Sequence, residues 1–176
     1  MTRPLSWDEL ATPGPPWAYM VRCVESQVDW FALHGSERHF EGVIRIIRGE
    51  RCSNVRQLLQ EWAAALQFPY YFGHNWDAFE ECLADLSWLP APAYVLFVTR
   101  VNDLLELDPQ AFKLFADILK KVASEWQGRH LGVEADDTRM FRVIFHSEPE
   151  STGVANRRLS DASLKPEPRA LPLDPS

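Results

Sequence analysis

The sequence lacks the features that mark secreted, membrane and metal-binding proteins. Its three cysteines, Cys23, Cys52 and Cys82, are scattered without paired or metal-like spacing, which is typical of reduced thiols in a cytosolic protein. The first residues contain no apolar signal-peptide core, and no apolar run approaches the roughly 20 residues that span a membrane. We therefore expect a cytoplasmic protein that has neither an export signal nor a membrane segment.

Positive charge is also scarce. The formal net charge is −7, which argues against direct binding of nucleic acid, because that requires Lys and Arg to displace counterions. It suits a basic protein partner instead. No Lys or Arg occurs between Arg56 and Arg100. The same interval contains five acidic residues, which are Glu61, Asp77, Glu80, Glu81 and Asp85.

The segment 68–86, FPYYFGHNWDAFEECLADL, carries most of these acids. Its Pro, aromatic run and Gly are typical of a short rigid loop. From Asn75 onward the pattern predicts a helix, because apolar residues recur at helical spacing. The predicted inward face holds Phe79, Cys82, Leu83 and Leu86. Cys82 is therefore expected to be a buried small hydrophobe rather than a nucleophile.

The opposite face of this predicted helix is acidic. Asp77, Glu81 and Asp85 recur every four residues and Glu80 lies beside them; we call these four residues the acidic stripe. Like charges at this spacing destabilise an isolated helix by roughly 0.2–0.5 kcal/mol per pair, so local stability does not explain them. A solvated face is one interpretation. The neighbouring aromatic residues, at 70–72 and Trp76, favour a binding surface as the other.

An enzyme is a weaker interpretation of the same residues. His74, Asp77 and Glu81 fall three and four residues apart, as metal ligands on a helix would. A metal site needs three or four convergent ligands, and no HExxH or HxH motif completes this set. The sequence also has no nucleophile motif and no phosphate-binding Gly loop. We therefore expect no catalysis, no metal and no cofactor.

The loop and predicted helix resemble those of the barstar family. Proteins of this family are intracellular inhibitors of a ribonuclease. The matching positions are Pro69, Tyr71, Gly73, Asn75, Asp77, Ala78, Cys82 and Leu83. The resemblance covers roughly residues 42–146. It departs from the family pattern at Glu80, where barstar has Trp, and at Glu81, where barstar has Asp. The later helix offers Lys120 or Lys121 where the resemblance implies an acid.

The resemblance implies a protein that binds a basic ribonuclease or ribonuclease-like toxin one-to-one, as an antitoxin or immunity protein does. An acidic helix and an aromatic loop would enter the basic active site. The residues expected to contact the partner are Tyr71, Gly73, Asn75, Trp76, Asp77, Glu80, Glu81 and Asp85. The departures predict a target other than the family's usual nuclease. An immunity or adaptor protein for a basic partner that is not a nuclease is the alternative.

The order of elements predicts an α/β fold. Apolar strands at 43–48, 94–99 and 140–145 alternate with capped helices, which implies a small parallel sheet with right-handed crossovers. Asp108 and Pro109 supply an N-cap and a first-turn Pro for the later helix. The resemblance agrees with this architecture. The fold class expected is α/β, with a three- to four-stranded parallel sheet packed by helices.

Composition divides the chain into one domain with two tails. Residues 17–146 are expected to form the domain, in which 17–41 add a strand–helix unit at an edge. Residues 1–16 are polar and Pro-rich and are expected to be a flexible lead. Residues 147–176 contain five prolines and few clustered apolar residues, so we expect a disordered tail that is dispensable for stability.

Overall fold

The structure, a computed structural model, describes residues 2–37, 40–129 and 139–172. The helices are α1 (Trp7–Ala11), α2 (Glu25–Glu37), α3 (Val55–Leu66), α4 (Trp76–Asp85), α5 (Ala111–Arg129) and α6 (Thr152–Asp161). Two short 3-10 helices are η1 (Gly49–Arg51) and η2 (Pro149–Ser151). The strands are β1 (Ala18–Arg22), β2 (Val43–Arg48), β3 (Ala93–Thr99), β4 (Met140–Ser147) and β5 (Glu167–Arg169).

The described strands form one five-stranded sheet in the order β2–β3–β4–β1–β5, and every pair in it is parallel. Each row of the sheet joins distant parts of the chain, as in Ile46–Phe97–Ile144. The α/β class, the parallel sheet and its packing by helices are confirmed. The sheet has one strand more than the upper end of the expected range, because β5 adds to the edge beside β1.

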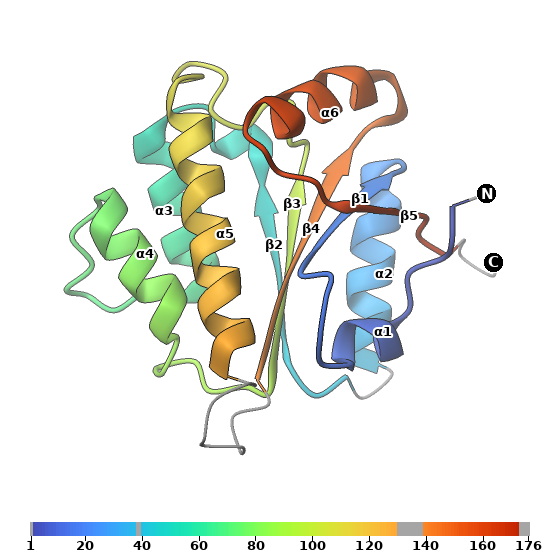
Figure 1. Ribbon diagram of the computed structural model, residues 1–176, viewed down its shortest axis with the longest axis horizontal. Helices are drawn as coiled ribbons and strands as arrows, with labels where there is room; N and C mark the ends of the chain where they lie inside the picture. Colours follow the sequence, from blue (N-terminus) through green and yellow to red (C-terminus); the bar gives the residue numbers. More distant parts are fainter. Residues whose placement is uncertain (1, 38–39, 130–138, 173–176) are drawn as a thin grey trace.

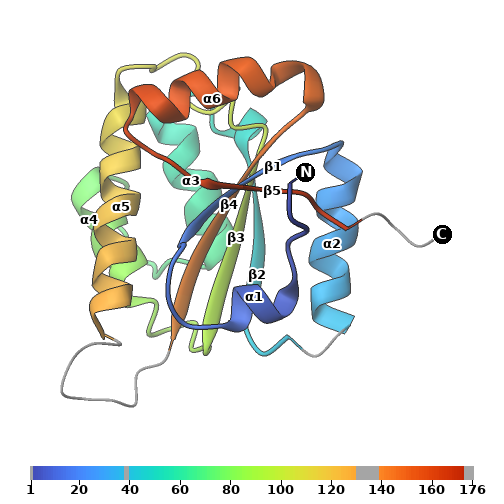
Figure 2. The ribbon, with the colours of Figure 1, turned by 45° about the vertical axis from the view of Figure 1, so that its right-hand side comes forward.

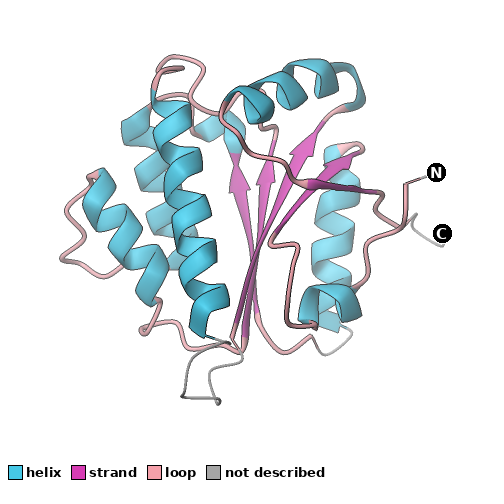
Figure 3. Ribbon diagram, in the orientation of Figure 1, coloured by secondary structure: helices cyan, strands magenta, loops and turns pink. Residues whose placement is uncertain are grey.

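Helices cover both faces of the sheet (Figure 1, Figure 3). One core lies beneath α3, α4 and α5, and a second lies beneath α1 and α2. The central strand β3 is buried along its whole length, with Tyr94, Leu96 and Val98 in the first core and Val95 and Phe97 in the second. Such two-sided burial explains its continuous apolar sequence. None of the described helices combines the length and the apolar character that a membrane span requires.

The start of α3 is capped from two directions. The Asn54 side chain accepts a hydrogen bond from the Gln57 amide at 2.9 Å, as its sequence position predicts. Asp108 was expected to cap α5, but α5 begins at Ala111 and the Asp108 carboxylate accepts from the Val55 amide at 2.9 Å. The reason is the loop before α5, which hydrogen-bonds to the chain ahead of α3 and carries Asp108 to the unpaired amides there.

The C-terminal segment is ordered where the sequence predicted disorder. Residues 149–172 form η2, α6 and β5, and four of their side chains enter the first core, namely Ala155, Leu159, Ala162 and Leu164. The apolar residues of this segment are few, but helical spacing gathers them on one side of α6. Pro168 lies in β5, at the outer edge of the sheet, where a residue without an amide hydrogen is tolerated.

The N-terminal segment is also ordered where a flexible lead was expected. Leu5 and Leu10 are buried in the second core, and Ser6 caps α1 by accepting from the Glu9 amide. The guanidinium of Arg142, which is buried in β4, donates to the Thr12 carbonyl at 2.6 Å. Few apolar residues suffice here, because β1 and α2 already supply most of the surface on which they pack.

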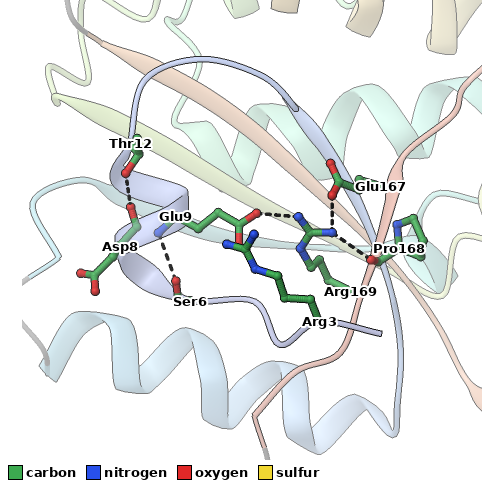
Figure 4. A network of polar contacts seen from close by, with 8 residues as sticks. All are labelled: Arg3, Ser6, Asp8, Glu9, Thr12, Glu167, Pro168 and Arg169. Atoms are coloured by element: carbon green, nitrogen blue, oxygen red, sulfur yellow. Dashed lines mark hydrogen bonds and ion pairs between the residues drawn. The ribbon is translucent and has the colours of Figure 1, made fainter. Parts of the chain in front are cut away.

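The two end segments bind to each other (Figure 2). The Leu5 amide donates to the Ala170 carbonyl at 2.8 Å, and the Ala170 amide donates to the Arg3 carbonyl at 3.2 Å. Figure 4 shows the Arg169 guanidinium between Glu167 and Glu9, with 2.8 Å to the Glu9 carboxylate. The hydrogen bond to Glu9 raises the pKa of Arg169. The expected edge strand β1 is therefore not at the edge, because β5 lies outside it.

Leu159 tests whether α6 is part of the folded domain. Leu159→Ala should lower the free energy of unfolding by about 2–5 kcal/mol, because it leaves a cavity in the first core. Val154, 56% exposed on the same helix, is the control, and Val154→Ala should change stability by less than about 0.5 kcal/mol. Urea unfolding followed by circular dichroism measures both. Equal midpoints for the two variants would show that α6 does not pack as described.

Candidate partner-binding surface

The loop before α4 turns two tyrosines outward. Phe72 is buried and its ring packs edge-on against Phe68, with centroids 4.9 Å apart. The Phe72 amide closes a turn on the Pro69 carbonyl at 2.9 Å. Anchored at both ends, the turn leaves Tyr70 100% and Tyr71 67% exposed, with their rings edge-to-face at 5.6 Å. The loop thus presents a pair of aromatic side chains to solvent.

Gly73 and Asn75 shape the loop where it enters α4. The Asn75 side chain accepts from the Ala78 amide at 2.9 Å and donates to the Gly73 carbonyl at 3.3 Å. A Cβ on Gly73 would lie 2.9 Å from the Asn75 side-chain nitrogen, so a larger residue would disturb the cap. His74 between them is left-handed, with φ of 50°. The asparagine at this position is therefore an N-cap in the free protein.

Helix α4 places its two faces as its sequence predicts. Phe79, Cys82 and Leu83 are buried, and the Phe79 ring packs edge-on against Trp62 with centroids 5.4 Å apart. Asp77, Glu81 and Asp85 are exposed on the other side. Trp76, at the first position, is half-buried, with its ring 5.8 Å from that of Phe79. The acidic stripe consequently stands on a firmly packed helix.

One cation reaches the acidic stripe from outside the helix. Lys121 of α5 forms an ion pair with Glu80 across the helix–helix groove. The hydrogen bond to Glu80 raises the pKa of Lys121, and the nearby charges of Glu125 and Asp77 add to this. The segment 57–99 contains no Lys or Arg, but the folded protein brings Lys121 beside it, so its acidic residues are less isolated than the sequence suggests. Glu80 is partly neutralised, whereas no Lys or Arg of the described chain pairs with Asp77, Glu81 or Asp85.

The other lysines on the exposed side of α5 are paired within their own helix. Asp117 lies 2.9 Å from the Lys113 ammonium and 2.7 Å from that of Lys120. Hydrogen bonds from these two lysines, Lys120 first, lower the pKa of Asp117. Lys121 is therefore the α5 lysine that forms an ion pair with the acidic stripe.

Neither thiol nor metal chemistry is supported at this surface. Among the residues that the structure describes, no group of three or more His, Cys, Asp and Glu is placed to hold a metal ion. The His74 ring packs on Phe72, with centroids 4.7 Å apart. Cys82 is buried as expected, and burial, followed by the charges of Asp85 and Glu81, raises the pKa of its thiol. Its reactive thiolate form is thereby disfavoured.

Sequence reasoning did not predict the exposure of Tyr70 or the contact of Lys121 with Glu80. Tyr70 is the most exposed aromatic side chain of the loop, yet the run of three aromatic residues does not say which of them turns inward. Lys121 lies 41 residues from Glu80 along the chain, and no local pattern joins them. No local sequence signal identifies Tyr70, because the turn that buries Phe72 is closed by a backbone hydrogen bond to the Pro69 carbonyl.

The division of α4 into a core face and an exposed face can be tested by stability. Phe79→Ala should lower the free energy of unfolding by about 3–5 kcal/mol, because a large buried ring is lost. Glu81→Ala should change it by less than about 0.5 kcal/mol, since removing a like charge offsets what little the side chain contributes. Chemical denaturation measures both variants. A Glu81→Ala protein that fails to fold would show that the carboxylate has a structural role.

Comparison with known proteins finds a family match for the central part of the chain. A family model described as Barstar (barnase inhibitor) matches residues 43–146, which is more than half of the chain. The matched region runs from β2 to β4 and contains the aromatic loop and α4. No curated protein is similar enough to the chain to count as a relative.

Proposed function

Because the chain belongs to the barstar family, that of the barnase inhibitor, we propose that it inhibits a ribonuclease or ribonuclease-like toxin in the cytoplasm. It binds this enzyme one-to-one through α4 and the loop at 68–75, and it has no catalytic step of its own. The acidic stripe enters the enzyme's active site. That site must be basic, because a ribonuclease binds a polyanion.

The observation that carries this proposal is the exposed, unneutralised set Asp77, Glu81 and Asp85 on a packed helix. These carboxylates can stand where RNA phosphates stand and pair with the Lys and Arg side chains that bind them. Charge complementarity of this kind speeds association and rejects partners of the wrong charge. Fast capture matters for an inhibitor that protects a cell from a lethal enzyme.

The loop supplies the apolar part of the contact. Tyr71 and its neighbour Tyr70 extend from the loop beside the start of α4, where they can occupy the region of the enzyme that receives a base. Tyrosine contributes large contact area at a small entropic cost, and aromatic residues of this kind are frequent in binding hot spots. Trp76, half-buried, adds an apolar edge between the loop and the acidic stripe.

Lys121 and Glu81 bear on which enzyme is bound. The ion pair with Glu80 places a positive charge beside the acidic stripe, and the longer Glu side chain carries its carboxylate farther from the helix than Asp would. Both features differ from the family pattern described above. We infer that the cognate enzyme is not the usual nuclease of the family.

Asp77 should dominate binding. With the partner captured from the producing cells and purified, Asp77→Ala should weaken binding by at least about 2 kcal/mol, because basic groups of the enzyme would be left buried without a partner. Lys113→Ala, in the first turn of α5, is the control and should change the binding free energy little. Isothermal titration calorimetry and RNA cleavage at saturating inhibitor measure the effect. Undiminished cleavage would reject inhibition and leave the non-nuclease partner as the explanation.

Association should also depend on salt. Raising the ionic strength past about 0.1 M, where the Debye length is roughly 10 Å, should lower the association rate constant. The dissociation rate constant should change far less. Stopped-flow mixing of the two proteins gives both rates. An association rate that does not change with salt, or one equally salt-dependent in Asp77→Ala, would show that the acidic stripe does not guide the encounter.

A further inference from the structure

A second surface lies on the sheet face opposite α4. A groove of about 890 Å³ is lined by residues of α1, α2 and the segment that leads into β2; these elements lie at the right of Figure 1, with α4 at the left. Four aromatic side chains line the groove, namely Trp7, Trp30, Phe31 and Phe40. All four lie outside the region that matches the family, 43–146, although Pro92 and Met140 of that region also line the groove.

The aromatic wall is built into the fold. The Trp7 ring stacks on Phe31 with centroids 4.7 Å apart and lies 4.9 Å from Phe40. A Cβ on Gly35 of α2 would come within 2.2 Å of the Trp7 ring, so a glycine is required for the ring to lie against the helix. A groove held open by such packing needs little rearrangement to accept a ligand, which favours binding.

The charge of the groove is negative. Asp8 and Glu41 line it and are both exposed, and no Lys or Arg is among the described residues that line it. Figure 4 shows the Asp8 carboxylate turned away from the Glu9–Arg169 contact. Aromatic walls with carboxylates match a ligand that is apolar and cationic, because the ring faces attract cations and the carboxylates pair with them.

The apolar surface continues beyond the groove along α2. Trp30, Leu33 and His34 share one face of this helix, the rings of Trp30 and His34 are stacked at 4.4 Å, and Leu33 is 62% exposed. A small molecule seated in the groove would not cover Leu33. An extended chain segment would cover both. The continuation therefore favours a peptide ligand over a small one.

We propose that this groove binds an apolar segment of a partner protein that carries Lys or Arg side chains. Apolar groups of the segment pack on Trp7, Trp30 and Leu33, and its cations pair with Asp8 and Glu41. A second copy of this chain fits less well, because a two-fold contact through the groove would bring these carboxylates together. The site is independent of the ribonuclease proposal, since α4 lies on the other side of the sheet.

The test uses the full chain and a fluorescein-labelled peptide of alternating Leu and Lys, with fluorescence anisotropy as the readout. The double variant Asp8→Asn, Glu41→Gln should weaken binding by about fivefold or more, as the loss of two exposed ion pairs does. The matched control Glu150→Gln, Asp161→Asn removes the same charge from two exposed residues that lie outside both the groove and the acidic stripe, and it should leave the dissociation constant within about twofold. Leu33→Gln, which removes the apolar contact without adding a charge, should weaken binding by about tenfold or more.

Several results would overturn the proposal. Equal weakening by the two double variants would show attraction by net charge alone, and equal binding of a Leu–Glu peptide would remove the role of the carboxylates. A dimer in solution that Leu33→Gln dissociates would assign the surface to a second copy. Thermal unfolding checks that each variant is folded. Should Leu33→Gln fail that check, the pair of double variants decides the matter alone.

Discussion

A parallel sheet must be covered on both faces, and the rest of this structure depends on that requirement. The strands β3 and β4 are buried from end to end, so neither face can be left to solvent. Helices α3 and α5 cover one face, and α4 packs on the outside of these two helices. The other is covered by α1, α2 and the two end segments, which carry Leu5, Leu10 and Leu171 into the second core. The segments outside the family match thereby complete the core of the same sheet.

The acidic helix α4 packs on other helices and not directly on the sheet, which leaves its outer face exposed. Helix α4 packs against α3 and α5, with Phe79 between Trp62 and Phe115. At its other end the Trp126 indole of α5 donates to the Leu83 carbonyl at 3.0 Å. The helix is held at both ends by aromatic residues, and its outer face remains entirely available. Carboxylates on such a support lose little freedom when they bind, which favours affinity.

Local patterns predicted the elements that are local in origin. The apolar runs of β2, β3 and β4, the start of α4 near Asn75 and the inward face at Phe79 follow from spacing within one element, and the structure has them there. Contacts between distant residues escaped prediction. Asp108 was predicted to cap the next helix along the chain, α5, whereas the loop places its carboxylate at the start of α3.

The tails escaped prediction for a similar reason. Their apolar residues are too sparse to indicate burial until the sheet that receives them is known, and Arg169 lies 160 residues from Glu9. Of the candidate site, the exposure of Asp77, Glu81 and Asp85 followed from helical phase. The Glu80–Lys121 pair and the outward turn of Tyr70 did not, because both depend on how the loop and α5 pack.

The pairing of the end segments brings the first and last described parts of the chain side by side. Pro4 and Ala170 are bridge partners, so a short linker could join the two ends without altering any strand pairing, and new ends could be opened in an exposed loop. The described end segments, 2–6 and 167–172, also lie across the molecule from α4 (Figure 1). A tag or surface anchor at either end therefore leaves the acidic helix open to solution, whereas the same attachment stands close to α1 and crowds the aromatic groove.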